Sequence, residues 1–183
     1  MPRYTLHAQA PKLSLVSIRG AALPVPDPSY SWTHLQFRRF AGCPICNLHI
    51  RTFAHQLQTL EAASIKEIIF FHSTAEDMLP YQGQIPMDCI ADPEKTYYKI
   101  FGVETSILGV LDPRNLLASF KGLLAKHPKN PAQNDPNGAL GMPADILIDK
   151  QGRIVALKYG RYADDQWTVE ELLAIAQELP QGD

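Results

Sequence analysis

The chain has 183 residues, of which 45% are apolar and 20% charged, with a formal net charge of −2. This composition is typical of one ordinary globular domain and argues against a disordered chain. Three cysteines are too few for a disulfide scaffold. Without a dense basic block or a long apolar run, we expect no nucleic-acid partner and no membrane insertion. The polar start contains no signal core, so we expect a cytoplasmic location.

The first half of the chain predicts strands that alternate with helices. Runs typical of strands occur at three places, residues 13–18, 33–40 and 65–71. The second strand should be half-buried, and the third should be central and parallel because it is almost wholly apolar. Residues 20–31 contain three prolines and predict an extended connection. Apolar residues recur at helical spacing from about Asn47, which predicts a helix ending near residues 62–64.

The second half predicts shorter elements and one insertion. Helices are expected at 73–81, 92–102, 116–124 and 168–179, and strands at 87–91, 144–149 and 154–159. Asp92 is expected to be the N-cap of its helix, with Pro93 as the first helical residue and Gly102 as the C-terminal cap. Thr168 to Glu171 reads as a capping box. Residues 104–141 are expected to form a surface insertion.

This order of elements predicts a thioredoxin-like α/β fold. A strand–helix–strand unit is followed by a β-hairpin and a terminal helix, which implies a central mixed β-sheet flanked by helices. No internal repeat or linker divides the chain. We therefore expect one domain over residues 1–183, with its core at about 13–178.

The segment Cys43-Pro44-Ile45-Cys46 carries the strongest chemical signal. A Cys-x-x-Cys that enters a helix after a strand predicts a redox dithiol, because the free N–H groups of the first helical turn stabilise a thiolate. The thiolate is the form that attacks disulfides and peroxides. The catalytic candidates are therefore Cys43 and Cys46, and the alternative is two reduced cysteines that only pack in the core. Cys89 is expected to be buried and structural.

Three residues near the dithiol have open roles. His49 lies one helical turn beyond Cys46, so it either faces the thiol and lowers its pKa when protonated, or points to solvent. Arg38 and Arg39 point to opposite faces of a strand, so one of them either reaches the dithiol or remains a surface cation. Structural zinc needs four ligands, and no second Cys/His pair has suitable spacing, so we expect no metal.

The run from Leu35 to His49 resembles the peroxiredoxin-like branch of the alkyl hydroperoxide reductase/thiol-specific antioxidant (AhpC/TSA) family, within the thioredoxin superfamily. The stretch from Gly141 to Ile154 resembles the second half of the same fold, and the likeness covers roughly residues 13–178. The resemblance implies an antioxidant enzyme that reduces peroxides. It also implies an external thiol reductant of the thioredoxin or glutathione type and a possible homodimer.

The family's peroxide site resembles Pro-x-x-x-Thr-x-x-Cys with a distant arginine. In this sequence Cys46 takes the position of the peroxidatic cysteine, Cys43 replaces the threonine and Arg39 replaces the proline. Pro143 stands where the family often places its arginine, and there it matches the cis-proline that faces the dithiol in thioredoxins. We therefore predict a cis Met142–Pro143 bond. The substrate-binding candidates are Met142, Pro143, Arg39 and His49.

The two resemblances imply opposite orders of attack. In the thioredoxin order Cys43, expected to be the more exposed thiol, attacks and Cys46 resolves. In the peroxiredoxin order a peroxide oxidises Cys46, and Cys43 then condenses with the sulfenic acid. Both orders end in a Cys43–Cys46 disulfide. The sequence thus predicts a thiol-dependent oxidoreductase that reduces peroxides or disulfides and needs no organic cofactor. The alternative is a non-catalytic redox sensor or binding module on the same fold.

Overall fold

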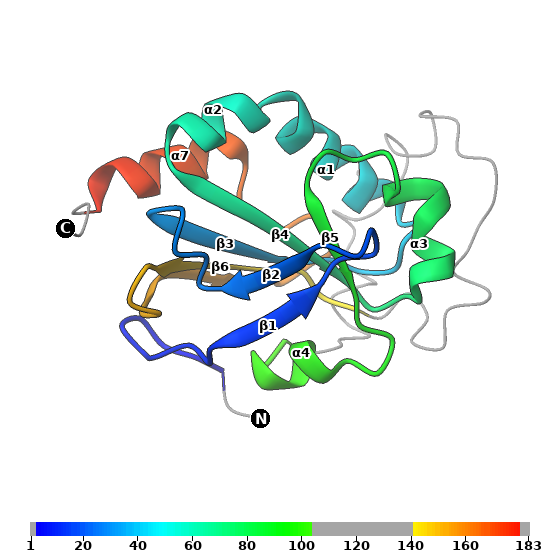
Figure 1. Cartoon of the computed structure of the whole chain (residues 1–183), viewed down its shortest axis with the longest axis horizontal. Coiled ribbons are helices and arrows are strands. Elements are labelled where there is room, and N and C mark those ends of the chain that lie inside the picture. The colour runs from blue at the N-terminus through cyan, green and yellow to red at the C-terminus, as the bar shows by residue number, and fades with distance from the viewer. Residues whose placement is uncertain (1–2, 104–140, 180–183) are drawn as a thin grey trace.

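The computed structural model describes residues 3–103 and 141–179, and its main element is a five-stranded sheet (Figure 1). The strand order is β5-β4-β3-β6-β7. The strands are β3 (Trp32–Phe37), β4 (Ile65–Phe71), β5 (Asp88–Ala91), β6 (Ala144–Asp149) and β7 (Ile154–Tyr159). β4 runs parallel to both β3 and β5, whereas β6 is antiparallel to β3 and β7. The sheet is therefore mixed, and the strand over 65–71 is central and parallel, as predicted.

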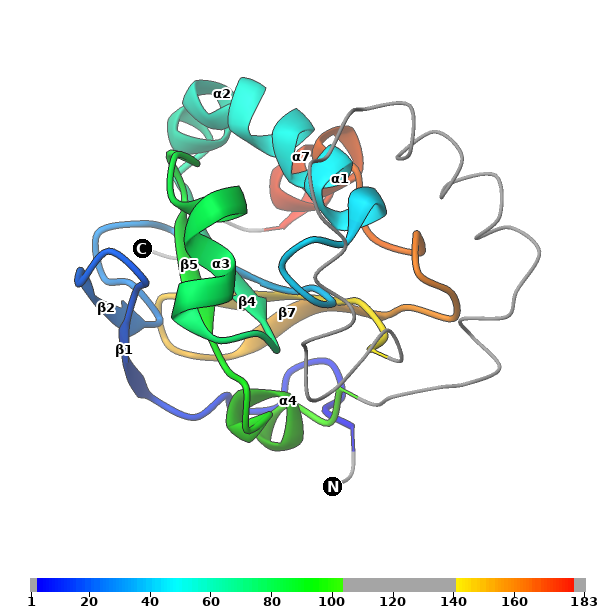
Figure 2. The ribbon, with the colours of Figure 1, turned by 90° about the vertical axis from the view of Figure 1, so that its right-hand side faces the viewer.

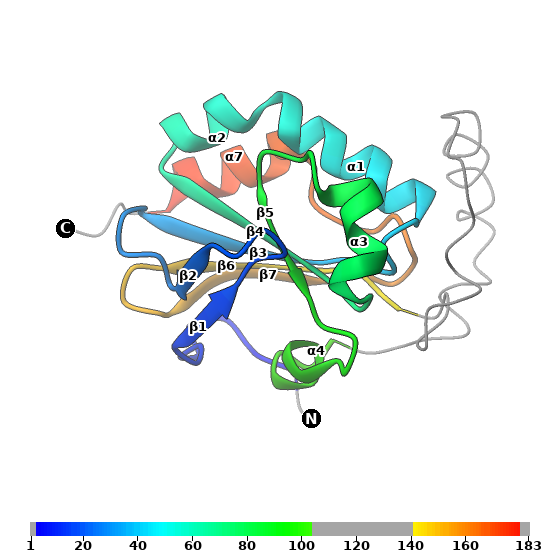
Figure 3. The same ribbon diagram turned by 45° about the vertical axis from the view of Figure 1, so that its right-hand side comes forward.

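Helices and a small hairpin cover the two faces of this sheet (Figures 2 and 3). One face carries α1 (Pro44–His55), α2 (Leu57–Ala62) and α7 (Val169–Glu178). The opposite face carries α4 (Thr96–Ile100) and the antiparallel pair β1 (Leu13–Val16) and β2 (Ala22–Val25). α3 (Ala75–Gln82) lies between β4 and β5 in the chain. No helix of the described residues is long and apolar enough to cross a membrane.

The sheet separates two apolar clusters. Successive side chains of a strand point to opposite faces, so Ile69 and Phe71 of β4 join the cluster beneath α1 while Ile68 and Phe70 join the other. The first cluster includes both Cys43 and Cys46 as well as residues of α1 and α7. The dithiol therefore belongs to the helix-covered face.

Two sequence expectations for local structure are wrong, and a third is confirmed with an added strand. The first long helix begins at Pro44 rather than Asn47, because Cys43 is its N-cap. The extended connection over 20–31 contains strand β2, in which Pro24 is tolerated because β2 pairs with β1 alone in a two-stranded sheet. The strand expected to be half-buried is buried along all of β3, because α1 and α7 cover its polar face.

The helix expected at 92–102 is also shorter than predicted. It begins at Thr96, after Lys95, and Asp92 instead accepts the N–H groups of Thr96 and Tyr97 at 2.8 and 2.7 Å. Its predicted C-terminal cap is confirmed, since Gly102 has a φ of +66°. The capping box at Thr168 is confirmed as well. The predicted helix at 116–124 lies outside the described residues, as does the insertion over 104–141 except Gly141.

Candidate active site

The dithiol sits at the beginning of α1, just beyond the end of β3. Cys43 is the N-cap residue, and Pro44 takes the first helical position, where its missing N–H costs nothing. The Cys43 sulfur accepts the backbone N–H of Cys46 at 3.4 Å. The Cys46 thiol donates to the same sulfur at 2.8 Å, and both cysteines are reduced. The two sulfurs are thus already neighbours at a helix N-terminus, where a thiolate is favoured.

Arg39 is the arginine that reaches the dithiol. Its Nη1 donates to the Cys43 sulfur at 3.9 Å, and its side chain is only 7% exposed. Arg38 turns to the polar interior of the protein instead, where it pairs with Asp145. Both arginines lie beyond β3, which ends at Phe37 rather than at Phe40, but they still point in different directions, so their roles are separate.

These donors act unequally on the two thiols. Burial opposes ionisation of Cys43, but the Cys46 thiol, the Arg39 charge and the N–H groups of Cys46 and Ile45 outweigh it, so the pKa of Cys43 falls to about 7. Burial, the hydrogen bond to Cys43 and the charge of that neighbour raise the pKa of Cys46 well above its ordinary value. Cys43 is therefore the thiol that ionises first.

The expectation that Cys43 is the more exposed thiol is wrong. Both Cys43 and Cys46 have 0% exposure, because they pack into the apolar cluster with Phe40, Ala41 and Ile45. The difference between the two thiols lies in their hydrogen bonds and in Arg39, not in their access to solvent. Cys89 is also buried, on β5, and burial raises its pKa to about 12.

His49 turns toward Arg38. Its Nε2 lies 3.3 Å from Nη2 of Arg38, and its ring packs 4.8 Å from the ring of Phe53. Burial and the Arg38 charge lower the pKa of His49 to about 3, so the ring is neutral near pH 7. The hypothesis that a protonated His49 stabilises the thiolate is therefore wrong, because the side chain is already the partner of a cation.

The predicted cis bond at Met142–Pro143 is wrong. Among the described residues the only cis peptide bond is Val25–Pro26. The trans bond leads Pro143 directly into β6, and its carbonyl accepts the Gly160 N–H at 2.9 Å. Gly141, the residue before Met142, lies beside Arg39, since a Cβ built on it would be 3.6 Å from the Arg39 Cα.

A cavity of about 290 Å³ runs along α1, and its wall includes Ile45 but neither of the two cysteines. Its wall combines apolar residues near the start of the helix with hydroxyl, amide and carboxylate groups farther along. The lining residues are Ile45, Leu48, His49, Thr52, Gln56, Asp164, Thr168 and Glu170. Among the described residues, no group of three His, Cys, Asp or Glu side chains is arranged to hold a metal ion.

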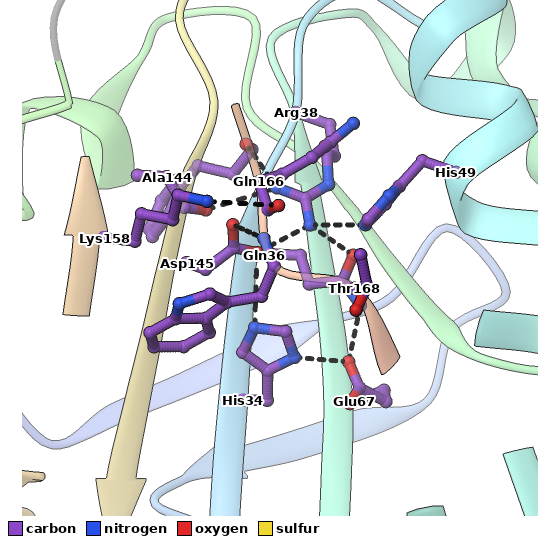
Figure 4. A network of polar contacts seen from close by, with 12 residues as sticks. His34, Gln36, Arg38, His49, Glu67, Ala144, Asp145, Lys158, Gln166 and Thr168 are labelled. Carbon is purple, nitrogen blue, oxygen red and sulfur yellow. Dashed lines mark hydrogen bonds and ion pairs between the residues drawn. The ribbon is translucent and has the colours of Figure 1, made fainter. Parts of the chain in front are cut away.

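A buried polar network lies under α1 and contacts His49 of that helix (Figure 4). Arg38 is its centre: Nη2 donates to Oδ1 of Asp145 at 2.6 Å and to Oε1 of Gln36 at 2.7 Å. His34 pairs through Nδ1 with Glu67 at 2.8 Å and through Nε2 with Asp145 at 3.3 Å. This network, which no pattern in the sequence predicts, connects three strands and, through His49, helix α1.

The network places the cations of His34 and Arg38 beside the carboxylates of Glu67 and Asp145, in a site that solvent does not reach. Burial disfavours a charged His34, but Glu67 and Asp145 outweigh it and raise the pKa of His34 to about 9. Burial also opposes ionisation of Asp145, but Arg38 and His34 outweigh it and hold the pKa of this carboxyl well below its ordinary value. His34 is therefore protonated at neutral pH.

A charged His34 predicts that the free energy of unfolding depends on pH. Its folded pKa of about 9 exceeds the ordinary value of 6.5, so its contribution is complete below pH 6.5 and is lost as the pH rises through 9. Cys43 has the opposite trend, because its lowered pKa adds stability above pH 7. Urea unfolding in a Cys43→Ser background should therefore show a fall in stability between pH 6.5 and 9. A flat profile contradicts a charged His34.

Comparison with protein families identifies the chain. Residues 52–161 match the family of AhpC/TSA antioxidant enzymes, which is more than half of the sequence. The chain therefore belongs to this family, as its sequence predicts. The matched range begins after Cys43 and Cys46, so it does not include the dithiol. A search of the curated proteins finds no match.

Solved structures confirm the thioredoxin-like fold with its central mixed sheet. The peroxidoxin BcpB from Mycobacterium tuberculosis is 11% identical with a TM-score of 0.69, over 96% of this chain and 97% of that chain. A cysteine-to-serine mutant of peroxiredoxin 6 from Arenicola marina is 14% identical with a TM-score of 0.70, over 95% and 72%. A putative thiol:disulfide interchange protein DsbE from Chlorobium tepidum is 16% identical with a TM-score of 0.60, over 94% and 98%.

Proposed function

We propose that this protein is a thiol-dependent peroxidase in which Cys43 attacks and Cys46 resolves. The observation that carries the proposal is the set of donors around one sulfur: Cys43 accepts from the Cys46 N–H, the Cys46 thiol and Arg39. These contacts favour the thiolate of Cys43 and keep Cys46 protonated. They support the thioredoxin order of attack within a chain of the AhpC/TSA family.

The reaction needs only sulfur chemistry. The Cys43 thiolate attacks one peroxide oxygen, the O–O bond breaks, and the leaving oxygen takes a proton to become water or an alcohol, so that Cys43 is oxidised to a sulfenic acid. The Cys46 thiol then condenses with it, which forms the Cys43–Cys46 disulfide and releases water. An external dithiol reduces this disulfide through a mixed disulfide and restores both thiols.

We propose that Arg39 performs the role of the family's distant arginine, because Pro143 occupies the position of that arginine in this sequence. A guanidinium beside the sulfur stabilises the thiolate and donates to the peroxide oxygen on which charge develops. Its contact with Cys43 supports this role, and its low exposure strengthens the effect of its charge. Met142 and Pro143 remain proposed substrate contacts, because the segment that contains them passes beside Arg39.

Disulfide reduction is the second candidate, and the order of the two thiols favours it. A nucleophilic first cysteine with a protonated second cysteine is the arrangement that attacks a disulfide and then releases the mixed disulfide. The thiol:disulfide interchange protein among the similar structures has the same fold. Peroxide remains the first proposal because the chain belongs to a family of antioxidant enzymes.

The test is a pair of single-turnover reactions on pre-reduced protein. One equivalent of hydrogen peroxide or of hydroxyethyl disulfide is added, and mass spectrometry follows the loss of two hydrogens that marks the intramolecular disulfide. We expect faster oxidation by the peroxide, followed by repeated turnover when dithiothreitol is supplied. Oxidation by the disulfide alone supports the second candidate instead. Oxidation by neither reagent contradicts an enzymatic role.

A further inference from the structure

The loop that carries Cys43 is held by side-chain amides from two helices. Asn47 on α1 donates from Nδ2 to the carbonyl groups of Ala41 and Cys43, at 2.7 and 3.1 Å. Gln82 at the end of α3 donates from Nε2 to the same Ala41 carbonyl at 2.9 Å and to Oδ1 of Asn47 at 2.7 Å. Ser73 accepts the Ala41 N–H at 2.9 Å. The backbone on both sides of Gly42 is therefore fixed by buried hydrogen bonds.

These hydrogen bonds form in a dry interior. Asn47 is 4% exposed, Gln82 is 1% exposed and Ser73 is 2% exposed. In such surroundings a carbonyl group that loses its donor has no water to replace it, so each bond strongly restricts the loop. The restriction includes Cys43 itself, whose extended backbone directs its sulfur toward the Cys46 N–H.

We propose that Asn47 and Gln82 are positioning residues for Cys43, because their amides hold the loop in the one arrangement that keeps the sulfur against all three of its donors. This inference rests on the proposed function, in which Cys43 is the attacking thiol. It also couples α3 to the site: Gln82 ends that helix but contacts the loop before the dithiol. Neither residue needs to touch a substrate.

The test measures the acidity of Cys43 rather than turnover. In a Cys46→Ser background, iodoacetamide alkylation of Cys43 is followed by mass spectrometry from pH 5 to 10. We expect Gln82→Met to slow alkylation about threefold at pH 6, because the loop relaxes away from the donors of Cys43. Asn47→Asp should slow it about tenfold, since it places a carboxylate against two carbonyl groups and adds charge near the thiolate.

Gln36→Met is the matched control. Gln36 is also a wholly buried amide, and it bonds to Glu67 and Arg38 rather than to the Cys43 loop. It should lower the melting temperature as much as Gln82→Met does but leave the alkylation profile unchanged. If Gln82→Met does not fold, as judged by circular dichroism, the nearly isosteric Asn47→Asp provides the test.

Two outcomes distinguish a failure of the positioning role from a failure of the proposed order of attack. If folded Gln82→Met and Asn47→Asp keep the alkylation profile of the parent, or if Gln36→Met shifts it equally, the positioning role is wrong. If Cys43 of the wild-type protein, with the Cys46 thiol in place, titrates near the ordinary thiol value of about 8.5, the proposed order of attack is wrong whatever the variants do.

Discussion

Cys43→Ser should abolish peroxide consumption, whereas Cys46→Ser should still react once and then stop. Cys43 has the lowered pKa and the Arg39 contact, so without it no thiolate is available to break the O–O bond. Without Cys46 the sulfenic acid on Cys43 forms but no neighbouring thiol resolves it. Trapping with dimedone should therefore label Cys46→Ser at one equivalent per chain and leave Cys43→Ser unlabelled.

Cys89→Ser is the control for this experiment. Cys89 is buried on β5, and burial raises its pKa to about 12, so its removal should leave the rate of peroxide loss unchanged. The reverse pattern, with label on Cys43→Ser and none on Cys46→Ser, establishes the peroxiredoxin order that the sequence resemblance implies. Such a result contradicts the assignment of Cys43 as the attacking thiol.

The dithiol could be predicted from sequence because its chemistry is local. Two cysteines at this spacing, after a strand and before a helix, place a sulfur at a helix N-terminus whatever the remainder of the fold. The role of Arg39 could be predicted only in part. Alternation along a strand indicates that Arg38 and Arg39 point to opposite sides, but it does not say which of them reaches the site. The exposure of Cys43 was mispredicted, because burial depends on residues that are distant in the sequence.

The polar network could not be predicted for the same reason. His34, Gln36 and Arg38 alternate with apolar residues, a pattern that ordinarily marks a solvent-facing side of a strand. Only the strand register places Glu67 opposite His34 and Asp145 opposite Gln36. A single sequence does not fix that register. The misjudged burial of β3 and the missed role of Asp145 thus have one physical cause.

The second large effect is expected from this network and concerns stability. Asp145→Asn should lower the free energy of unfolding by about 3–5 kcal/mol, because it leaves Arg38 and His34 with one carboxylate between them in a site without water. Asp145 and Arg38 are both 0% exposed, so solvent cannot screen the remaining charges. Urea denaturation at pH 7 measures the loss.

A surface pair provides the comparison. Arg153 also pairs with an aspartate, Asp149, at 2.9 Å, but its side chain is 60% exposed, so Arg153→Met should cost less than about 1 kcal/mol. The double variant Arg38→Met with Asp145→Leu should recover part of the stability that Asp145→Asn loses, because it removes both charges together. Equal small losses for Asp145→Asn and Arg153→Met would show that water reaches the network. In that case the network is a solvated cluster rather than a buried support for α1.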